Sequence, residues 1–150
     1  MSQSLSKQYI HIVFHTKYNQ DLIKPDVETE LYAYLGGILQ HNKSVPIAIN
    51  GIENHVHILC IMSKNISLAY LLEELKRNSS RWIKTKGADY TDFAWQGGYG
   101  GFSVSQSKVD VVKKYIKDQK EHHKRETSKE EYIRFLKEYE VDYNEDYLWT

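Results

Sequence analysis

Two histidines separated by one residue, His55 and His57, form the first pattern in this sequence that could support chemistry. On a β-strand their imidazoles would project side by side, because side chains alternate between the two faces of a sheet. Two neutral imidazoles on a stiff strand make a good half-site for a divalent metal. The same spacing also occurs in pairs that only pack at a sheet edge, so both interpretations stand at this point.

A metal held by two imidazoles needs further ligands, and a helix predicted over residues 108–124 offers candidates. Tyr115 and Gln119 lie four residues apart, so they would share one face of that helix. The Gln119 side chain supplies a carbonyl oxygen, which suits magnesium or manganese. The Tyr115 side chain supplies a phenolic oxygen that can attack phosphorus once it is deprotonated or assisted by a metal.

These assignments have alternatives. The chain contains twelve tyrosines, and most helical tyrosines are amphipathic packing residues. His122 and His123 lie close to the same face, so either could replace Gln119 as a ligand. The single cysteine, Cys60, lies three residues after His57 and therefore on the opposite face of the strand. We predict that Cys60 is a core residue.

The apolar pattern indicates which elements position these side chains. Alternating or continuous apolar runs predict strands, and apolar residues at helical spacing predict helices. The expected order is strand, helix, a hairpin of two strands, helix, strand and two final helices, over residues 8–16, 25–42, 46–52, 55–62, 67–86, 102–105, 108–124 and 128–139. This order is typical of an α+β fold with a ferredoxin-like (RRM-like) antiparallel sheet, helices packed on it and extra C-terminal helices. We expect residues 1–150 to form one domain.

Charge is distributed unevenly, although the formal net charge is zero. Residues 126–150 hold eight acidic and three basic residues, which predicts a solvated acidic face. A run without any acid supplies five basic side chains, Lys76, Arg77, Arg81, Lys84 and Lys86. Local positive potential attracts a polyanion such as a nucleic acid, so we predict phosphate contact here, with Trp82 as a candidate for base stacking. The alternative is a solvated helix face with Trp82 in the buried stripe.

Four of the eight glycines lie within residues 94–101, which cannot form a regular helix. The segment is interpreted either as a hinge that lets the tyrosine-bearing helix move or as a tight turn between sheet and helix. It lacks the lysine and the strand–helix context of a phosphate-binding loop, so we expect no nucleotide cofactor.

The single cysteine also excludes an intramolecular disulfide, which favours a reducing compartment. No basic stretch followed by an apolar run marks a signal peptide, and no apolar run approaches the ~20 residues of a membrane span. We therefore expect a cytoplasmic protein that does not enter a membrane.

Several of these segments resemble the single-tyrosine HUH transposases of small bacterial insertion sequences, the insertion sequence 200-like family, which includes repeat-associated tyrosine transposases. The resemblance is carried by residues 54–57, 95–105, 115–119 and 121–123, and by Asp146-Tyr147-Leu148-Trp149. It extends from about residue 9 to the last residues. Each motif alone is modest evidence, whereas their order and spacing together are specific.

The resemblance implies a DNA transposase that cuts and rejoins single-stranded DNA. His55 and His57 would be the histidine pair on a divalent metal, Mg²⁺ or Mn²⁺, with Gln119 as the third protein ligand. Tyr115 would be the nucleophile, forming a 5′-phosphotyrosine link and releasing a 3′-hydroxyl that later rejoins the strand. The implied substrates are single-stranded element ends that fold into hairpins. The implied assembly is a homodimer, in which the tyrosine helix can complete either its own site or the partner's.

Two other functions compete with this interpretation. Plasmid relaxases and rolling-circle replication initiators are HUH nucleases that share the histidine pair and the tyrosine, but the compact chain and the glycine-rich segment favour the transposase. A non-catalytic nucleic-acid-binding protein on a ferredoxin-like sheet would stack bases on strand aromatics. Such a protein would not need His55, His57, Tyr115 and Gln119 together.

Overall fold

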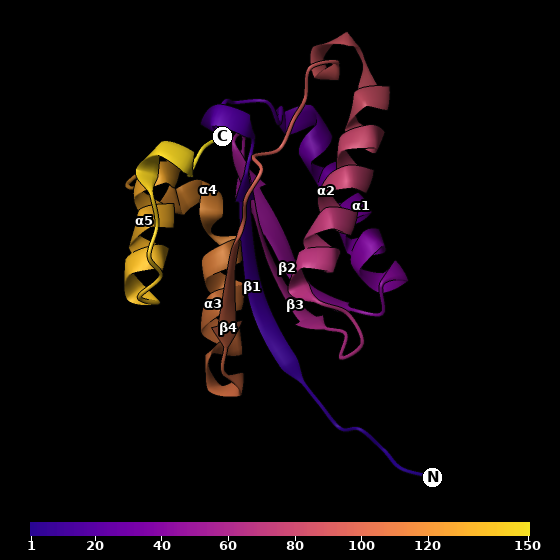
Figure 1. Ribbon diagram of the computed structural model, residues 1–150. Coiled ribbons are helices and arrows are strands. Elements are labelled where there is room, and N and C mark those ends of the chain that lie inside the picture. The colour runs from indigo at the N-terminus through magenta and orange to yellow at the C-terminus, as the bar shows by residue number, and fades with distance from the viewer.

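One antiparallel sheet forms the centre of the protein (Figure 1). A computed structural model describes residues 1–150. The strands lie in the order β2-β3-β1-β4, with β1 at Gln8–His15, β2 at Val45–Ile52, β3 at His55–Met62 and β4 at Gly100–Val104. Because β3 pairs with both β2 and β1, the strand that carries the histidine pair is central. The sheet and its helices confirm the predicted α+β fold class.

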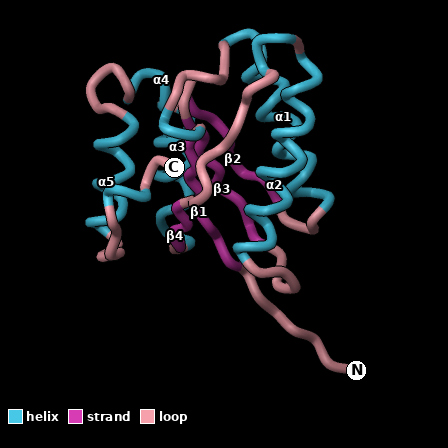
Figure 2. Tube along the Cα trace, turned by 45° about the horizontal axis from the view of Figure 1, so that its top comes forward, coloured by secondary structure: helices cyan, strands magenta, loops and turns pink.

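Helices cover both faces of the sheet, as Figure 2 shows from a second angle. One face is covered by α1 (Pro25–His41) and α2 (Leu68–Ile83), and the other by α3 (Val109–Lys117), α4 (Gln119–His122) and α5 (Ser128–Glu138). Even-numbered side chains of β1 and β3, such as Phe14 and Ile58, form the larger core with α1 and α2. Cys60 is buried in that core, as predicted. None of the helices combines the length and the apolar character needed to cross a bilayer.

The C-terminal end of α2 differs from the prediction. The α-helix ends at Ile83, and a single 3-10 turn continues it to Lys86. Ile83 is the buried side chain at this end, whereas Trp82 is half-buried and stacks on Tyr34 of α1 with ring centroids 4.9 Å apart. Trp82 still packs against the larger core as a partly buried side chain, so it lies at the edge of the buried stripe.

The single helix predicted over residues 108–124 is interrupted, because α3 ends at Lys117 and α4 begins at Gln119. The side-chain amide of Asn50, on β2, donates to the carbonyl oxygens of the last two residues of α3 at 3.0 and 3.1 Å. In a continuous helix those carbonyls would accept backbone amides four residues further on, so their capture by Asn50 favours the break. Tyr115 and Gln119 consequently lie on two successive helices.

The glycine-rich segment contributes to the sheet. Gly100 and Gly101 are the first two residues of β4, which starts two residues earlier than predicted. A Cβ atom at Gly100 would lie 2.8 Å from the ring of Tyr132, so α5 approaches the sheet closely here. The tight-turn interpretation is therefore wrong for these two glycines, and the hinge stays a prediction.

The start of α5 is fixed by a capping box. The Thr127 hydroxyl accepts a hydrogen bond from the backbone amide of Glu130, and the Glu130 carboxylate accepts one from the backbone amide of Thr127. This reciprocal pair satisfies two amides that the first helical turn leaves without partners. The buried side chains of Tyr132 and Phe135 then pack with Phe102 of β4. The capping box and this aromatic packing together fix the orientation of the first turn of α5 against the sheet.

Gly51 is the tightest point of the β2–β3 hairpin. A Cβ atom there would lie 2.1 Å from the carbonyl oxygen of His55, a backbone atom that cannot move without shifting β3. We expect Gly51→Ala to lower the free energy of unfolding by about 1–3 kcal/mol, measured by denaturant unfolding.

The matched control is Gly37→Ala, since a Cβ atom at this exposed helical position meets nothing within 4 Å. That substitution should raise stability by about 0.4–1 kcal/mol, because alanine restricts the unfolded chain and favours helix. A Gly51→Ala protein as stable as the natural one would show that the hairpin tolerates the extra methyl group.

Candidate active site

Six of the seven histidines lie together between the sheet and the C-terminal helices, namely His11, His15, His55, His57, His122 and His123. Strand alternation directs the first four to one face, because all occupy odd positions of the paired strands β1 and β3. His55 and His57 are fully buried. Their burial argues against a pair that only packs at a sheet edge.

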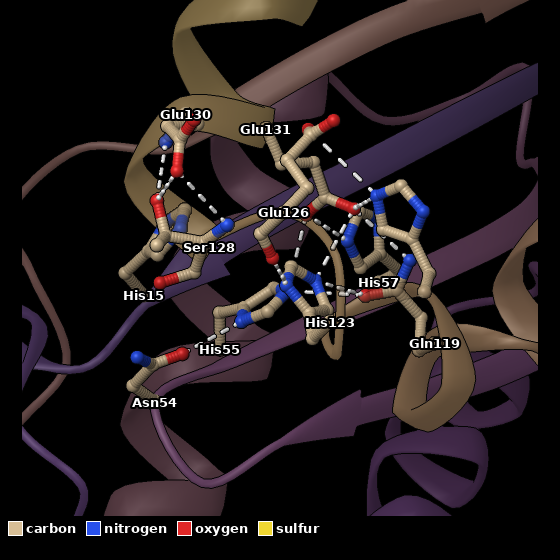
Figure 3. A network of polar contacts seen from close by, with 12 residues as sticks. His15, Asn54, His55, His57, Gln119, His123, Glu126, Ser128, Glu130 and Glu131 are labelled. Carbon is tan, nitrogen blue, oxygen red and sulfur yellow. Dashed lines mark hydrogen bonds and ion pairs between the residues drawn. The ribbon is translucent and has the colours of Figure 1, made fainter.

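Glu131, in the first turn of α5, lies at the centre of this cluster (Figure 3). Its Oε1 atom lies 2.8 Å from His57 Nε2 and 3.2 Å from His55 Nε2. Its Oε2 atom lies 3.3 Å from His123 Nε2 and 3.5 Å from His122 Nε2. Because its side chain is fully buried, this acid departs from the solvated C-terminal face that the charge distribution predicted.

The Gln119 side chain reaches the same place from the start of α4 and is also fully buried. Its Oε1 atom lies 3.2 Å from His55 Nε2 and 2.9 Å from His123 Nε2. Its side-chain amide donates to Glu131 Oε2 at 3.1 Å. The interruption after α3 thus leaves the amide oxygen facing the histidine pair.

Tyr115 adjoins the cluster from α3. Its hydroxyl donates a hydrogen bond to Glu131 Oε2 and accepts one from Arg134 Nη2 at 3.0 Å. His122 Nε2 lies 3.2 Å from the same hydroxyl. The half-buried phenol lines a pocket of about 500 Å³ whose other walls are Val111, Lys114, Asp118, Glu121, His122 and Arg125. An external molecule can therefore approach the cluster from this side, where Tyr115 and His122 line the pocket.

Two neighbours orient the imidazoles of the pair. His55 Nδ1 lies 2.8 Å from Asn54 Oδ1, an atom that can only accept, so Nδ1 carries the proton and Nε2 is left with a lone pair. His57 Nδ1 lies 2.8 Å from Nε2 of the buried His11. In both cases the Nε2 atom points toward Glu131. Hydrogen bonds to the far nitrogen orient metal-binding histidines in this way.

Burial sets the charges of the cluster. It lowers the pKa of His55 to about 4 and that of His11 well below its ordinary value, so both imidazoles are neutral at neutral pH. Burial alone would raise the pKa of Glu131, but the charge of His57 and hydrogen bonds from the surrounding histidines outweigh it, so the carboxyl stays ionised. Burial, followed by the charge of Glu131, raises the pKa of Tyr115, which keeps the phenol protonated at neutral pH.

The donor atoms fit a divalent metal. One ligand atom each from His55, His57, His123 and Glu131 lies within 4.8 Å of all the others. The distances from the Glu131 carboxylate oxygens to these imidazole nitrogens, 2.8–3.3 Å, resemble the ~3.0–3.4 Å between neighbouring ligands when metal–ligand bonds are ~2.1 Å. Imidazole nitrogens and carboxylate oxygens are suitable ligands for several first-row ions.

Residues 4–119 match the family model described as "Transposase IS200 like". The match covers well over half of the chain. The chain belongs to the IS200-like transposase family. No curated protein matches this transposase.

Two solved structures share the fold of this IS200-like transposase. A candidate transposase from Deinococcus radiodurans R1 is 21% identical, with a TM-score of 0.61, over 79% of this chain and 98% of the other. A REP-associated tyrosine transposase, solved bound to a REP hairpin, is 11% identical, with a TM-score of 0.60, over 82% of this chain and 74% of the other.

Sequence reasoning missed several side chains of the candidate site, above all Glu131. A detectable signal existed, since Glu131 lies four residues before Phe135 and therefore within the apolar stripe of its helix. His11 could have been found from its odd position on a strand that pairs with β3. Asn54 belonged to a motif of the resemblance but had no assigned role.

The five basic residues proposed for DNA contact lie on the other side of the sheet, on α2 and the 3-10 turn that follows it. Arg77 forms ion pairs with Glu73 and Glu74, and Lys86 pairs with Glu30 at 2.8 Å. Lys76 donates to the carbonyl oxygens of Gln96, at 2.9 Å, and Gly98. Only Arg81 and Lys84 are exposed without an ion pair or hydrogen bond to another side chain. These two are the most accessible of the five for a phosphate.

Lys76 gives a testable pH dependence. Burial lowers its pKa from 10.5 to about 8 in the folded protein. Between these values the unfolded chain binds more protons, so raising the pH favours the folded state. Relative to Lys76→Met, the natural chain should therefore gain free energy of unfolding as the pH rises from about 8 toward 10.5. The free energy of unfolding of each protein is measured by urea unfolding at several pH values. The same pH dependence for both proteins would rule out a lowered pKa for Lys76.

Proposed function

We propose that this protein is a metal-dependent transposase that cuts single-stranded DNA by attack of Tyr115 on a phosphodiester. The product would be a 5′-phosphotyrosine link and a free 3′-hydroxyl, and the reverse reaction would rejoin strands. The observation that carries the proposal is the convergence on one carboxylate. Glu131 contacts His55 and His57 through Oε1 and Tyr115 through Oε2.

The roles of the chain's own residues follow from these contacts. In the forward step the Tyr115 oxygen forms a bond to phosphorus, the bond from phosphorus to the 3′-oxygen breaks, and the leaving oxygen takes a proton from water to become the 3′-hydroxyl. Glu131 Oε2, which already accepts the phenol hydrogen bond, is the nearest acceptor for the proton. The Arg134 guanidinium, 3.0 Å from the phenol oxygen, would stabilise negative charge there. Because the phosphotyrosine conserves the energy of the phosphodiester, rejoining needs no nucleotide cofactor.

We propose His55, His57 and Gln119 as metal ligands, with Mg²⁺ or Mn²⁺ as the cofactor. When bound, such an ion polarises the scissile phosphate and neutralises charge on its oxygens. The neutral imidazole of His55 and the inward-facing amide oxygen of Gln119 support this assignment, since each presents a lone pair to the same volume. His123, 2.9 Å from Gln119 Oε1, is a further candidate ligand.

We propose single-stranded DNA with hairpin ends as the substrate. The strand to be cut would reach the pocket beside Tyr115, where Arg125 supplies positive charge and Lys114 is paired with Asp118. Arg81 and Lys84, with Lys76, Arg77 and Lys86 nearby, would contact a more distant part of the DNA. The related REP-associated transposase was solved with a REP hairpin, which supports this class of substrate.

We further propose a homodimer, as the family resemblance implies. The contacts among Tyr115, Glu131 and the histidine pair all form within one chain. A site completed in cis would keep these contacts, whereas a site completed in trans would exchange them between the two chains. Mixing a Tyr115→Phe chain with a His57→Ala chain tests this point, because only a site shared between chains would recover cleavage.

The direct test of the function is to incubate the protein with labelled single-stranded hairpin DNA and either Mg²⁺ or Mn²⁺. Formation of a protein–DNA species that survives a denaturing gel, and that requires the metal, would support the proposal. DNA binding that is indifferent to metal and yields neither cleavage nor a covalent species would instead support a non-catalytic binding protein.

A further inference from the structure

The carboxylate of Glu131 comes from a helix outside the residues that match the family model. That match ends at residue 119, and α5 begins at Ser128. A fully buried carboxylate is costly to fold unless charge partners and hydrogen bonds compensate it. Glu131 has several compensating contacts, from His57, His123, Tyr115 and Gln119, whereas His55 directs a lone pair at it. The chain thus places one negative charge directly among the proposed metal ligands.

We propose that Glu131 is itself a metal ligand, and that with His55 and His57 it makes the site selective for a first-row transition ion such as Mn²⁺ over Mg²⁺. This inference rests on the proposed function, because it assigns the metal of the same site. It adds an anionic ligand from α5 to the histidine pair and the amide.

Geometry supports the assignment. Glu131 Oε1 lies 2.8 and 3.2 Å from the two strand Nε2 atoms, and all three side chains are fully buried. These are the separations of direct hydrogen bonds, and they lie close to the ~3.0–3.4 Å between neighbouring ligands of one ion, so only small movements would let the three atoms bind one cation. The Nδ1 contacts of His55 with Asn54 and of His57 with His11 hold both Nε2 atoms toward the carboxylate.

Ligand chemistry gives the selectivity. Mg²⁺ favours oxygen ligands and retains several waters, whereas imidazole nitrogens favour transition ions. Two imidazoles, a carboxylate and the nearby His123 form a nitrogen-rich set in a buried volume. Such a set offers Mg²⁺ few oxygen atoms and little access for the waters that it prefers to keep.

The second oxygen of Glu131 links this site to the nucleophile. Oε2 accepts hydrogen bonds from the Tyr115 hydroxyl and the Gln119 amide. The carboxylate is therefore a bridge between the histidine pair and the tyrosine. The capping box immediately before it and the packing of Phe135 behind it hold that bridge in position.

The test measures metal binding by the full chain in the absence of DNA. After removal of metals with a chelator, Mn²⁺ and Mg²⁺ are titrated by calorimetry, and Co²⁺ binding is followed by its visible absorption. We expect the natural chain to bind Mn²⁺ at least about 10-fold more tightly than Mg²⁺. Glu131→Gln should weaken Mn²⁺ binding by about 10-fold or more and change the Co²⁺ spectrum, because a ligand should matter at least as much as an outer-shell partner.

Glu121→Gln is the matched control, since this exposed carboxylate on α4 pairs only with Lys124. It should bind both ions like the natural chain. Equal Mn²⁺ and Mg²⁺ affinities in the natural chain, or a folded Glu131→Gln protein with unchanged Mn²⁺ affinity and Co²⁺ spectrum, would overturn the proposal.

If Glu131→Gln does not fold, Glu131→Asp replaces it. Aspartate keeps the negative charge, but its side chain is one methylene too short to reach both the histidine pair and Tyr115. Weaker Mn²⁺ binding by that variant supports the proposal, and unchanged binding contradicts it. Since no DNA is present, these outcomes are independent of whether Tyr115 forms a covalent link. A failure of the proposed function would appear only in the DNA assay.

Discussion

Tyr115→Phe is expected to abolish covalent attachment of the protein to DNA while leaving hairpin binding largely intact. Phenylalanine preserves the ring that packs against His57 and Phe135 but removes the only atom that can attack phosphorus. Removal of a covalent nucleophile typically costs roughly 10⁴-fold or more in rate. The measurement is the rate of covalent product on a denaturing gel, together with the Kd for hairpin DNA.

Tyr132→Phe provides the control, because Tyr132 is a buried tyrosine that packs against His15 at the edge of the same cluster. Its hydroxyl forms no hydrogen bond with the histidine pair or Glu131. This variant should form the covalent product at close to the natural rate. Covalent product from Tyr115→Phe would show that a different residue is the nucleophile.

His57→Ala is expected to remove metal-dependent cleavage. His57 Nε2 is 2.8 Å from Glu131 Oε1, the shortest contact between that carboxylate and an imidazole. Loss of a ligand should weaken metal binding by roughly 100-fold or more, since loss of an outer-shell partner alone costs about 10–100-fold. The measurement pairs Mn²⁺ titration with the cleavage assay.

The same substitution also leaves the buried carboxylate with one partner fewer, so folding must be measured alongside it. Breaking a buried charge pair costs about 3–5 kcal/mol, and His57→Asn, which retains a polar side chain, is a milder second variant. His41→Ala is the control, since the seventh histidine lies exposed on α1. Manganese-dependent cutting at the natural rate by a folded His57 variant would remove this residue from the metal site.

Local patterns were sufficient to predict the strands and the orientation of the histidine pair. Alternation along β3 determines that His55 and His57 share a face, and the apolar residues after them determine that the strand is buried. The face that Cys60 occupies follows from the same alternation. Such features depend on neighbours in sequence, which is why the sequence alone predicts them.

The features that the sequence did not predict depend on contacts between distant segments of the chain. The interruption after α3 involves Asn50, a residue of β2 that no periodicity connects to that helix. Glu131 was assigned to an acidic, solvated face because its neighbours in sequence are acidic, yet tertiary packing buries it. A charged residue within an apolar helical stripe is the pattern that could have revealed it.

The basic run shows a further limit of local patterns. The sequence does not distinguish the five basic residues of this run. In the folded protein, however, the side chains of Lys76, Arg77 and Lys86 have hydrogen-bond or ion-pair partners, whereas those of Arg81 and Lys84 do not. Positive residues already paired with carboxylates or carbonyl oxygens are less available to phosphates. Their contribution to DNA binding therefore depends on contacts that composition does not reveal.

The most direct test of the central claim is to identify the residue to which DNA becomes attached. The covalent species formed with single-stranded hairpin DNA and Mn²⁺ is digested, and the peptide that carries the nucleotide is sequenced by mass spectrometry. Because the chain contains twelve tyrosines, the result distinguishes Tyr115 from eleven other candidate residues. The account predicts a 5′-phosphate on Tyr115 and a free 3′-hydroxyl on the released strand. A nucleotide on any other residue, or a released strand that ends in a 3′-phosphate, would contradict it.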